Sequence, residues 1–399
     1  MHPKNTALTN KAPPIKIGIN AHFLTRLPRR GIGTYGLHLI QEMTAAYPDI
    51  DFYLYIRHPD TESILPDRNN VFVRILPVPF DPLWEQLALP IAAYKDGVNL
   101  LHSIGNTGPV YKSGSIKYVL TIHDVMFLQS GDFVSKPATL YQRVGRLYRA
   151  FVTPKCACNS DAIITVSEFS RQDILALIPR LKTHHITVTY EGCDPIFSET
   201  SKQLNCKDFA FDKYNVIKPY IFCLGADDPR KNTLRLVNAY LKLVQEKGIE
   251  EMLVICGYRG WENSPAYKEV LRVGAGNRVK FLPFVSMEEL RSLYQQALLF
   301  IYPSLYEGFG IPILEAFTVG CPVIASNVTS LPEIGGDAVL YCDPKSTDNL
   351  TQTIDALIYD PVLRKTLVER GHIRASKFNW GQVAAKTIDI YRECLSSTD

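Results

Sequence analysis

Short apolar runs alternate with helix-like stretches along nearly all of this chain, and that alternation restricts its fold more than any other feature. Runs of this kind, each long enough for one buried strand, are typical of a parallel sheet flanked by helices. We therefore predict an α/β fold of two Rossmann-like, doubly wound domains. The expected strands lie at 15–21, 51–57, 71–79, 98–103, 117–124, the start of 161–170 and 185–192 in the first half, and at 218–225, 252–257, 279–284, 298–304 and 338–344 in the second.

The polar, weakly periodic segment 194–217 separates the two halves, and we predict that it links two domains. The N-terminal domain is expected at residues 15–195 and the C-terminal domain at 218–374, followed by a C-terminal helix over 375–399. Doubly wound sheets bind their ligands beyond the carboxyl ends of the strands. The expected site therefore faces the cleft between the domains.

Composition narrows the partners and the location. With 399 residues, 21% of them charged, and a net charge of +3, the chain gives no reason to expect a nucleic-acid partner. Its nine cysteines, an odd number set mostly in apolar runs, are typical of reduced thiols in the cytosol. We see no secretory signal and no apolar run of about 18 residues, so a cytoplasmic protein is expected.

No metal and no cofactor are expected from the sequence. Cys156 and Cys158 form a C-x-C pair, but no partner ligands follow at zinc-type spacing. No Asp-x-Asp lies in a suitable loop either.

Gly31, Gly33 and Gly36 match the glycine spacing of dinucleotide-binding loops. Their context differs, because a long loop separates them from the first strand and no acidic residue ends the second strand. Glycines at a helix N-terminus still let backbone N–H groups approach an anion. A glycine loop without a ligand is an equal alternative.

Arg230 and Lys231 lie between an expected strand and an expected helix, whose start Asn232 can cap. Two cations beside the positive end of a helix are unfavourable unless an anion is present, and a diphosphate would supply one. The alternative is a solvated basic pair compensated by Asp227 and Asp228.

Two glutamates, Glu307 and Glu315, flank a glycine-containing turn and the start of a helix. Pro312 fits the first turn of that helix, and Gly308 and Gly310 let the backbone pass close to a ligand. The N–H groups of the turn suit a phosphate, whereas the carboxylates can accept hydrogen bonds from sugar hydroxyls. The stretch therefore predicts a site for a nucleotide sugar.

The same stretch carries a family resemblance. Residues 307–316, EGFGIPILEA, resemble the signature of two glutamates separated by seven residues in the retaining glycosyltransferases of family four, which have the GT-B fold. The resemblance covers roughly residues 15–395 and includes the segments 122–124, 165–170, 225–232, 320–326 and 330–333. It implies two domains that face a central cleft and a C-terminal helix that crosses back to the N-terminal domain.

The resemblance also implies roles for individual residues. Glu307 would bind hydroxyls of the transferred sugar, Glu315 the ribose, and residues 257–259 with 284–285 the base. From the residue alone, His123 is interpreted as a structural histidine. The resemblance instead places it in the active site, in contact with the donor sugar near the 6-hydroxyl and with its carbonyl close to the anomeric carbon. The implied catalytic residues are His123, Arg230, Lys231 and Glu307; the donor-binding residues are Gly31, Gly33, Gly225, Arg230, Lys231, Val285, Gly308, Phe309, Gly310, Ile311 and Glu315; the acceptor-side residues are Asn20, His22, Asp124 and Ser167.

The implied reaction is the retaining transfer of a hexose from a nucleotide-diphosphate sugar to a hydroxyl of a glycan or lipid-linked acceptor. GDP-mannose is the favoured donor, in polysaccharide or O-antigen assembly. The alternatives are a sugar-nucleotide epimerase or a phosphorylase on the same architecture, and a non-enzymatic sugar-binding protein. Residues 20–22, Asn-Ala-His, differ from the Asp-Ala-Arg of many relatives, so the acceptor is the least transferable property.

The segment 143–155 interleaves four cations with apolar side chains. Such a segment suits a peripheral contact with an anionic lipid surface at the inner face of the membrane. A lipid-diphosphate acceptor is a second candidate partner for these cations. The segment alone favours a solvated helix face with an apolar core side.

Overall fold

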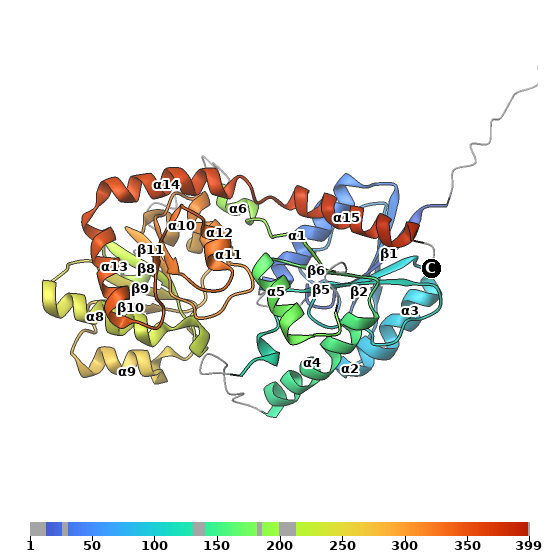
Figure 1. The fold of residues 1–399 in the computed structure, drawn as a ribbon, viewed down its shortest axis with the longest axis horizontal. Coiled ribbons are helices and arrows are strands. Elements are labelled where there is room, and N and C mark those ends of the chain that lie inside the picture. Colours follow the sequence, from blue (N-terminus) through green and yellow to red (C-terminus); the bar gives the residue numbers. More distant parts are fainter. Residues whose placement is uncertain (1–12, 26–30, 131–139, 182–185, 199–212, 398–399) are drawn as a thin grey trace, which may run out of the picture.

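This computed structural model describes residues 13–25, 31–130, 140–181, 186–198 and 213–397. Within them the chain forms two sheets of parallel strands, each flanked by helices (Figure 1). The first sheet has the order β3-β2-β1-β4-β5-β6-β7 and the second β10-β9-β8-β11-β12-β13. The predicted α/β fold of two Rossmann-like domains is therefore confirmed.

The N-terminal sheet consists of β1 (Ile15–Asn20), β2 (Ile50–Ile56), β3 (Val71–Ile75), β4 (Leu100–Ser103), β5 (Lys117–Ile122), β6 (Ala162–Thr165) and β7 (Ile186–Val188). The C-terminal sheet consists of β8 (Tyr220–Leu224), β9 (Met252–Cys256), β10 (Val279–Leu282), β11 (Leu299–Tyr302), β12 (Val323–Ser326) and β13 (Val339–Cys342). Strands β9, β11 and β12 are buried along their whole length, which explains why they read as continuous apolar runs.

The helices around the N-terminal sheet are α1 (Gly31–Ala46), α2 (Asp81–Leu83), α3 (Leu89–Asp96), α4 (Leu140–Asn159) and α5 (Glu168–Leu177). The later helices are α8 (Thr233–Lys247), α9 (Pro265–Arg272), α10 (Met287–Gln296), α11 (Ile311–Thr318), α12 (Leu331–Gly335), α13 (Thr347–Tyr359), α14 (Pro361–Ala375) and α15 (Trp380–Ser396). The short helix α6 (Pro195–Ser198) follows α5 in the chain and packs on α10 and α11 of the C-terminal domain. A π-helical turn, η1 (Trp84–Ala88), joins α2 to α3, and the 3-10 turns are η2 (Met126–Leu128), η4 (Pro229–Lys231) and η5 (Trp261–Asn263).

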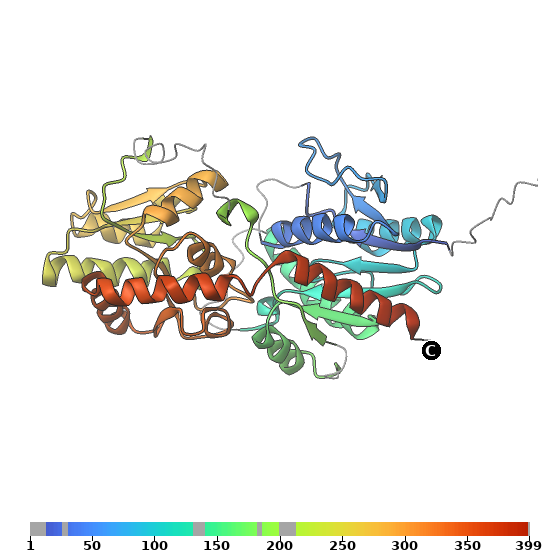
Figure 2. The same cartoon turned by 90° about the horizontal axis from the view of Figure 1, so that it is seen from above.

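The C-terminal helix crosses from one domain to the other, as the sequence predicts (Figures 1 and 2). Helix α14 packs on α11, the chain breaks after Ala375, and α15 packs on α1, β5 and β6. Trp380 Nε1, at the start of α15, donates a hydrogen bond to the Cys193 carbonyl at 3.1 Å. This bond joins the returning helix to the segment just before α6, where the chain first leaves the N-terminal domain. The predicted linker 194–217 lies partly outside the described residues, and the exact domain boundaries stay predictions.

Two local expectations differ from the structure. Helix α1 begins at Gly31 instead of Thr34, so the predicted glycine loop is its first turn. Asn232 does not cap α8 with its side chain: its backbone is left-handed, with φ of 58°, and Nδ2 donates to the Pro303 and Pro344 carbonyls instead. No sequence pattern marked residues 81–96 as helical, because Pro82 and Pro90 interrupt them.

The two domains are joined by hydrogen bonds around the N-terminus of α5. Glu333 of α12 accepts the backbone N–H groups of Glu168 at 2.7 Å and Phe169 at 3.1 Å. A carboxylate at this position satisfies two N–H groups that a helix start leaves without partners. Tyr306 donates to Asp173, one turn further along α5, at 2.5 Å. The C-terminal domain thus binds the start of an N-terminal-domain helix.

Among the described residues, none of the helices is both long and apolar enough to pass through a membrane.

We expect Glu333→Ala to separate the domains, because the variant leaves two N–H groups of α5 without an acceptor. The loss should weaken the closed arrangement by about 2 kcal/mol. Small-angle X-ray scattering should show a larger radius of gyration than in the wild type. Glu369→Ala, in an exposed pair with Lys365 on α14, is the control. An unchanged radius in Glu333→Ala would contradict the role of this contact.

Candidate functional site

The carboxylate of Glu307 lies between two cations of the same domain. Arg230 Nη1 is 2.6 Å from Oε2, and Lys231 Nζ is 2.7 Å from Oε1. The Glu307 side chain is 10% exposed, whereas those of Arg230 and Lys231 are 22% and 19% exposed. Residues that the sequence places 77 positions apart therefore form one cluster, whose cations still reach solvent.

Electrostatics keep this carboxylate ionised. Burial alone would raise its pKa, but Lys231 and Arg230 outweigh burial and lower the pKa of Glu307 to about 2. For Arg230, burial opposes the charge, and Glu307 and other neighbours nevertheless raise its pKa. The cluster is therefore charged at neutral pH. Its stabilisation is present above the ordinary glutamate pKa and is lost as the pH falls towards 2.

Several hydrogen-bond donors at this cluster have no protein partner in the part of the chain that the structure describes. Arg230 uses Nη1 and Nε on Glu307, Tyr306 and Asp228, which leaves Nη2. Lys231 uses two of its three protons, on Glu307 and Tyr302. These remaining donors can bind an anion.

The turn after Glu307 supplies further donors. Among the described residues, the backbone N–H groups of Phe309, Gly310 and Ile311 have no hydrogen-bond partner. They lie at the N-terminus of α11, where the helix dipole favours negative charge. Gly310 has φ of 133°, a conformation that side chains rarely adopt. The turn is fixed by Ser330, whose Oγ lies 2.9 Å from the Glu307 carbonyl oxygen and 2.5 Å from that of Phe309.

Glu315 lies one turn into α11 and is 7% exposed. Tyr294 donates a hydrogen bond to its Oε2 at 3.0 Å. Burial, together with nearby Asp194, raises the pKa of Glu315 to about 7 against the opposing effects of Tyr294 and Lys231. The two signature glutamates therefore differ: Glu307 is held ionised by cations, whereas Glu315 gains its proton near neutral pH.

His123 is bound within the N-terminal domain through both ring nitrogens. Nδ1 lies 3.2 Å from the Glu191 carboxylate, and Nε2 lies 3.0 Å from the Ile104 carbonyl oxygen. Burial lowers the pKa of His123, but Glu191 and the Ile104 carbonyl outweigh it, so the pKa is raised. The His123 carbonyl oxygen, by contrast, faces the other domain.

That carbonyl meets the glycine turn of the C-terminal domain. A Cβ atom at Gly308 would overlap the His123 carbonyl oxygen, so only glycine fits this position. Ser170 Oγ lies 3.0 Å from the carbonyl oxygens of both His123 and Gly308. Ser167 Oγ donates to the Gly308 carbonyl at 2.6 Å. The structure thus brings His123 and the Glu307 turn together across the domain boundary.

Two of the residues predicted on the acceptor side lie at this boundary. Ser167 binds Gly308, and Asp124 has a pKa raised by burial and lowered in part by Arg230. The other two lie together at the end of β1, where His22 Nδ1 is 2.7 Å from Asn20 Oδ1. Asn20 Nδ2 is buried and has no partner among the described residues.

The remaining predicted donor residues are distributed over both domains. Gly31 and Gly33 begin α1, whose Tyr35 packs edge-on against the His123 ring at 4.7 Å. Gly225 follows β8, and a Cβ atom there would overlap Ile255. Val285 lies half-buried before α10, beside the exposed Phe284 ring, over which Arg259 sits at 5.6 Å. The predicted base-binding segments 257–259 and 284–285 are therefore adjacent.

Sequence reasoning missed four residues that support these groups. Glu191 and Asn106 bind the His123 ring and backbone, and Tyr302 and Thr329 bind Lys231 and the Glu307 backbone. Glu191 follows β7 and Tyr302 ends β11. Both residues could have been found from the sequence by the signal used for His123, which is a polar side chain at the carboxyl end of an expected strand.

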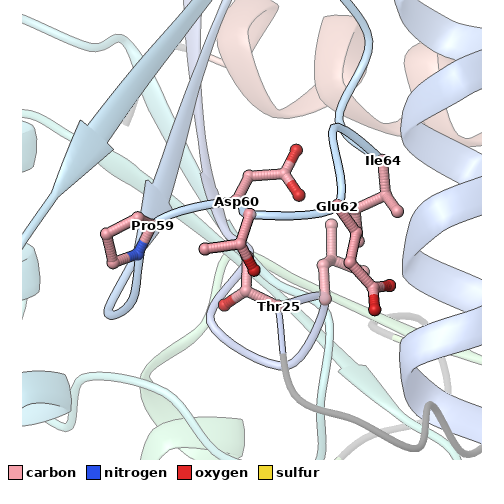
Figure 3. Close-up of a pocket in the computed structure, with 7 residues that line it drawn as sticks. Thr25, Pro59, Asp60, Glu62 and Ile64 are labelled. Carbon is pink, nitrogen blue, oxygen red and sulfur yellow. The ribbon is translucent and has the colours of Figure 1, made fainter.

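One small cavity lies elsewhere. Figure 3 shows it between Thr25 and the loop that carries Pro59, Asp60, Glu62 and Ile64. Its volume of about 20 Å³ holds a single water molecule and no sugar. None of its lining residues was predicted as a site residue. In the described ranges, no three His, Cys, Asp or Glu side chains are close enough to hold a metal ion.

Comparison with known proteins places the chain. The family described as "Glycosyl transferases group 1" matches residues 207–374. The O-antigen chain mannosyltransferase B of Escherichia coli is 34% identical over 275 residues, which cover 69% of this chain and 70% of that protein. The serotype-specific mannosyltransferase WbdA of Escherichia coli is 25% identical over 252 residues, which cover 60% of this chain and 29% of that protein.

Among solved structures, sucrose-phosphate synthase from Thermosynechococcus elongatus has the same fold. The two structures superpose with a TM-score of 0.74 at 20% sequence identity, and the alignment covers 96% of this chain and 100% of that chain. The predicted GT-B fold is confirmed by this likeness. The identity of 34% over about two thirds of both chains shows that this chain belongs, with the first Escherichia coli relative, to the glycosyl transferases group 1 family.

Proposed function

We propose that this glycosyltransferase moves a mannosyl group from GDP-mannose to a hydroxyl of a growing glycan or glycolipid in O-antigen or related polysaccharide assembly, with retention of configuration. The names of the Escherichia coli relatives support mannose and O-antigen. The observation that carries the donor class is the run of unpartnered N–H groups at α11 beside Arg230 and Lys231. These donors suit a diphosphate, and Glu307 beside them suits sugar hydroxyls.

In the proposed reaction, the bond between the anomeric carbon and the β-phosphate oxygen breaks as the acceptor oxygen bonds to the same carbon. Negative charge grows on the leaving diphosphate. Arg230, Lys231 and the N–H groups of Phe309 to Ile311 stabilise it electrostatically, which is commonly the largest catalytic contribution. The acceptor proton passes to the leaving phosphate oxygen on the same face of the sugar. No metal is needed for this step, since two cations and a helix N-terminus lie at the diphosphate.

The family resemblance implies that the His123 carbonyl lies close to the anomeric carbon, and the position of this carbonyl at the domain boundary supports that role. The His123 ring is bound by Glu191 and Ile104, so its carbonyl oxygen is the group next to the glycine turn. We propose that this carbonyl lies near the anomeric carbon, where positive charge develops in the transition state. Glu191 then acts as a positioning residue, because it fixes the ring and hence the peptide.

The proposed donor is tested by incubating the protein with GDP-mannose, UDP-glucose, ADP-glucose or a dTDP-sugar, with and without octyl α-mannoside. We expect GDP release from GDP-mannose that depends on the mannoside. Thermal shifts with GDP, UDP, ADP and dTDP should be largest for GDP, because bound nucleotide stabilises the folded chain. A changed nucleotide sugar without the mannoside would favour an epimerase, and consumption of none of the four donors would reject the proposal.

The cluster around Glu307 gives a prediction that separates stability from donor binding. Lys231→Met leaves the buried Glu307 carboxylate with one cation, which should destabilise the fold by about 2 kcal/mol. Adding Glu307→Gln removes the excess negative charge, because Arg230 keeps its pair with Asp228, and should restore most of the thermal stability. GDP affinity should stay weak in both variants, because the Lys231 ammonium is missing.

Thermal melting and titration calorimetry with GDP measure the two effects. Lys242→Met is the control and should bind GDP normally, because Lys242 lies on α8 in an exposed pair with Asp348 of α13. Glu307→Gln alone should retain GDP binding and lose turnover. Wild-type GDP affinity in the Lys231→Met and Glu307→Gln double variant would contradict the diphosphate role.

The raised pKa of Glu315 predicts a pH-dependent stability. The folded protein keeps this proton to about pH 7, whereas the unfolded chain releases it near pH 4.5. Stability therefore falls as the pH rises between these values, by at most about 3 kcal/mol. Glu315→Gln cannot ionise, so its melting temperature relative to the wild type should rise from pH 5 to pH 8. Glu369→Gln is the exposed control. A difference that does not change with pH would refute the buried, protonated state.

A further inference from the structure

Helix α4 exposes large apolar side chains along one side. Val144, Leu147 and Phe151 are 55%, 65% and 64% exposed. Because they are three and four residues apart, they lie on one face of the helix. Val152 and Cys156, on an adjacent face, are buried in the core of the N-terminal domain. The exposed apolar side chains therefore lie outside the helix face that packs against the domain core.

A second row of exposed apolar side chains lies on the neighbouring segment from α2 through η1 to α3. Leu83, Leu87, Ile91 and Tyr94 are 48%, 55%, 51% and 64% exposed. The two segments are held together by Tyr148 of α4, whose hydroxyl lies 2.6 Å from Glu85 Oε2 and 3.0 Å from Gln86 Nε2. Figure 1 shows α4 and α2 at the same edge of the N-terminal domain. We call the seven exposed residues the apolar face.

The charged side chains that border the α4 row are positive. Arg143 and Lys155 are exposed, and at 100° per residue they border the α4 row on its two sides. Helix α4 contains no acidic residue. On the neighbouring segment, Glu85 is 4% exposed and bound by Tyr148 and Thr107. Asp81 is paired with Arg57, and Asp96 is paired with Arg74. An approaching surface therefore meets apolar side chains bordered by cations.

We propose that the apolar face docks the N-terminal domain on a lipid bilayer with anionic headgroups. The apolar rows would enter the boundary between headgroups and acyl chains, and Arg143 and Lys155 would contact lipid phosphates. A second copy of the chain fits less well, because a symmetric contact through this face would bring the same cations together. The inference does not depend on the identity of the sugar donor.

Co-flotation of the full chain with vesicles tests the proposal. The wild type should bind vesicles of phosphatidylglycerol mixed with phosphatidylcholine. Leu147→Ser with Phe151→Ser should weaken this binding by about tenfold or more, because two inserted side chains are lost. Arg143→Gln with Lys155→Gln should weaken it by about fivefold for each cation. Binding to phosphatidylcholine alone should be weak for the wild type and both variants.

The control is Val362→Ser with Ile373→Ser on α14, at side chains 74% and 65% exposed in the other domain. This control should bind as the wild type does, and unchanged melting temperatures would show that all variants are folded. Three outcomes would overturn the proposal. The first is a wild type that does not bind vesicles, and the second is a Leu147→Ser, Phe151→Ser variant that binds them as well as the wild type does. The third is a concentration-dependent dimer that this double variant abolishes, which would make a second copy of the chain the occupant of the apolar face.

Discussion

A buried carboxylate between two cations holds the centre of this molecule together. Glu307 comes from the turn after β11, and Arg230 and Lys231 come from the turn after β8. Strands β8 and β11 are neighbours, and the strand order of the C-terminal sheet reverses between them. The ion pairs therefore join two loops at the topological switch point of the sheet, where doubly wound folds bind their ligands. Without both cations the carboxylate would be an unpaired buried charge, so the loops depend on each other.

The same loop carries the contact between the domains. Immediately after Glu307, Gly308 fits against the His123 carbonyl and is bound by Ser167 and Ser170. Glu333 binds the start of α5 close by. The contact between the domains and the proposed donor site thus use one short stretch of chain. A substrate that binds the unpartnered donors of this stretch would lie next to both domains, and closure of the domains over it would exclude water and limit hydrolysis of the donor.

Much of this arrangement could be predicted from the sequence, because buried parallel strands produce apolar runs and their carboxyl ends identify one edge of the sheet. That reasoning predicted Arg230, Lys231, Glu307 and the glycine turn as site residues, and the structure brings the three side chains together. It did not find Glu191 or the domain contact of Glu333, since their partners lie 68 and 165 residues away. The left-handed backbone of Asn232 was also missed, because it is set by the Pro303 and Pro344 carbonyls. The exposure of apolar side chains from α2 to α4 was not predicted either, because it depends on which helix faces the tertiary structure covers.

The central claim is that the donor diphosphate binds the Arg230 and Lys231 cations beside Glu307. The most direct measurement is a crystal structure of the protein with GDP-mannose. The account predicts phosphate oxygens within hydrogen-bond distance of Arg230, Lys231 and the N–H groups at the start of α11, with a mannose hydroxyl donating to Glu307. A diphosphate bound elsewhere, with all three side chains unchanged, would contradict it.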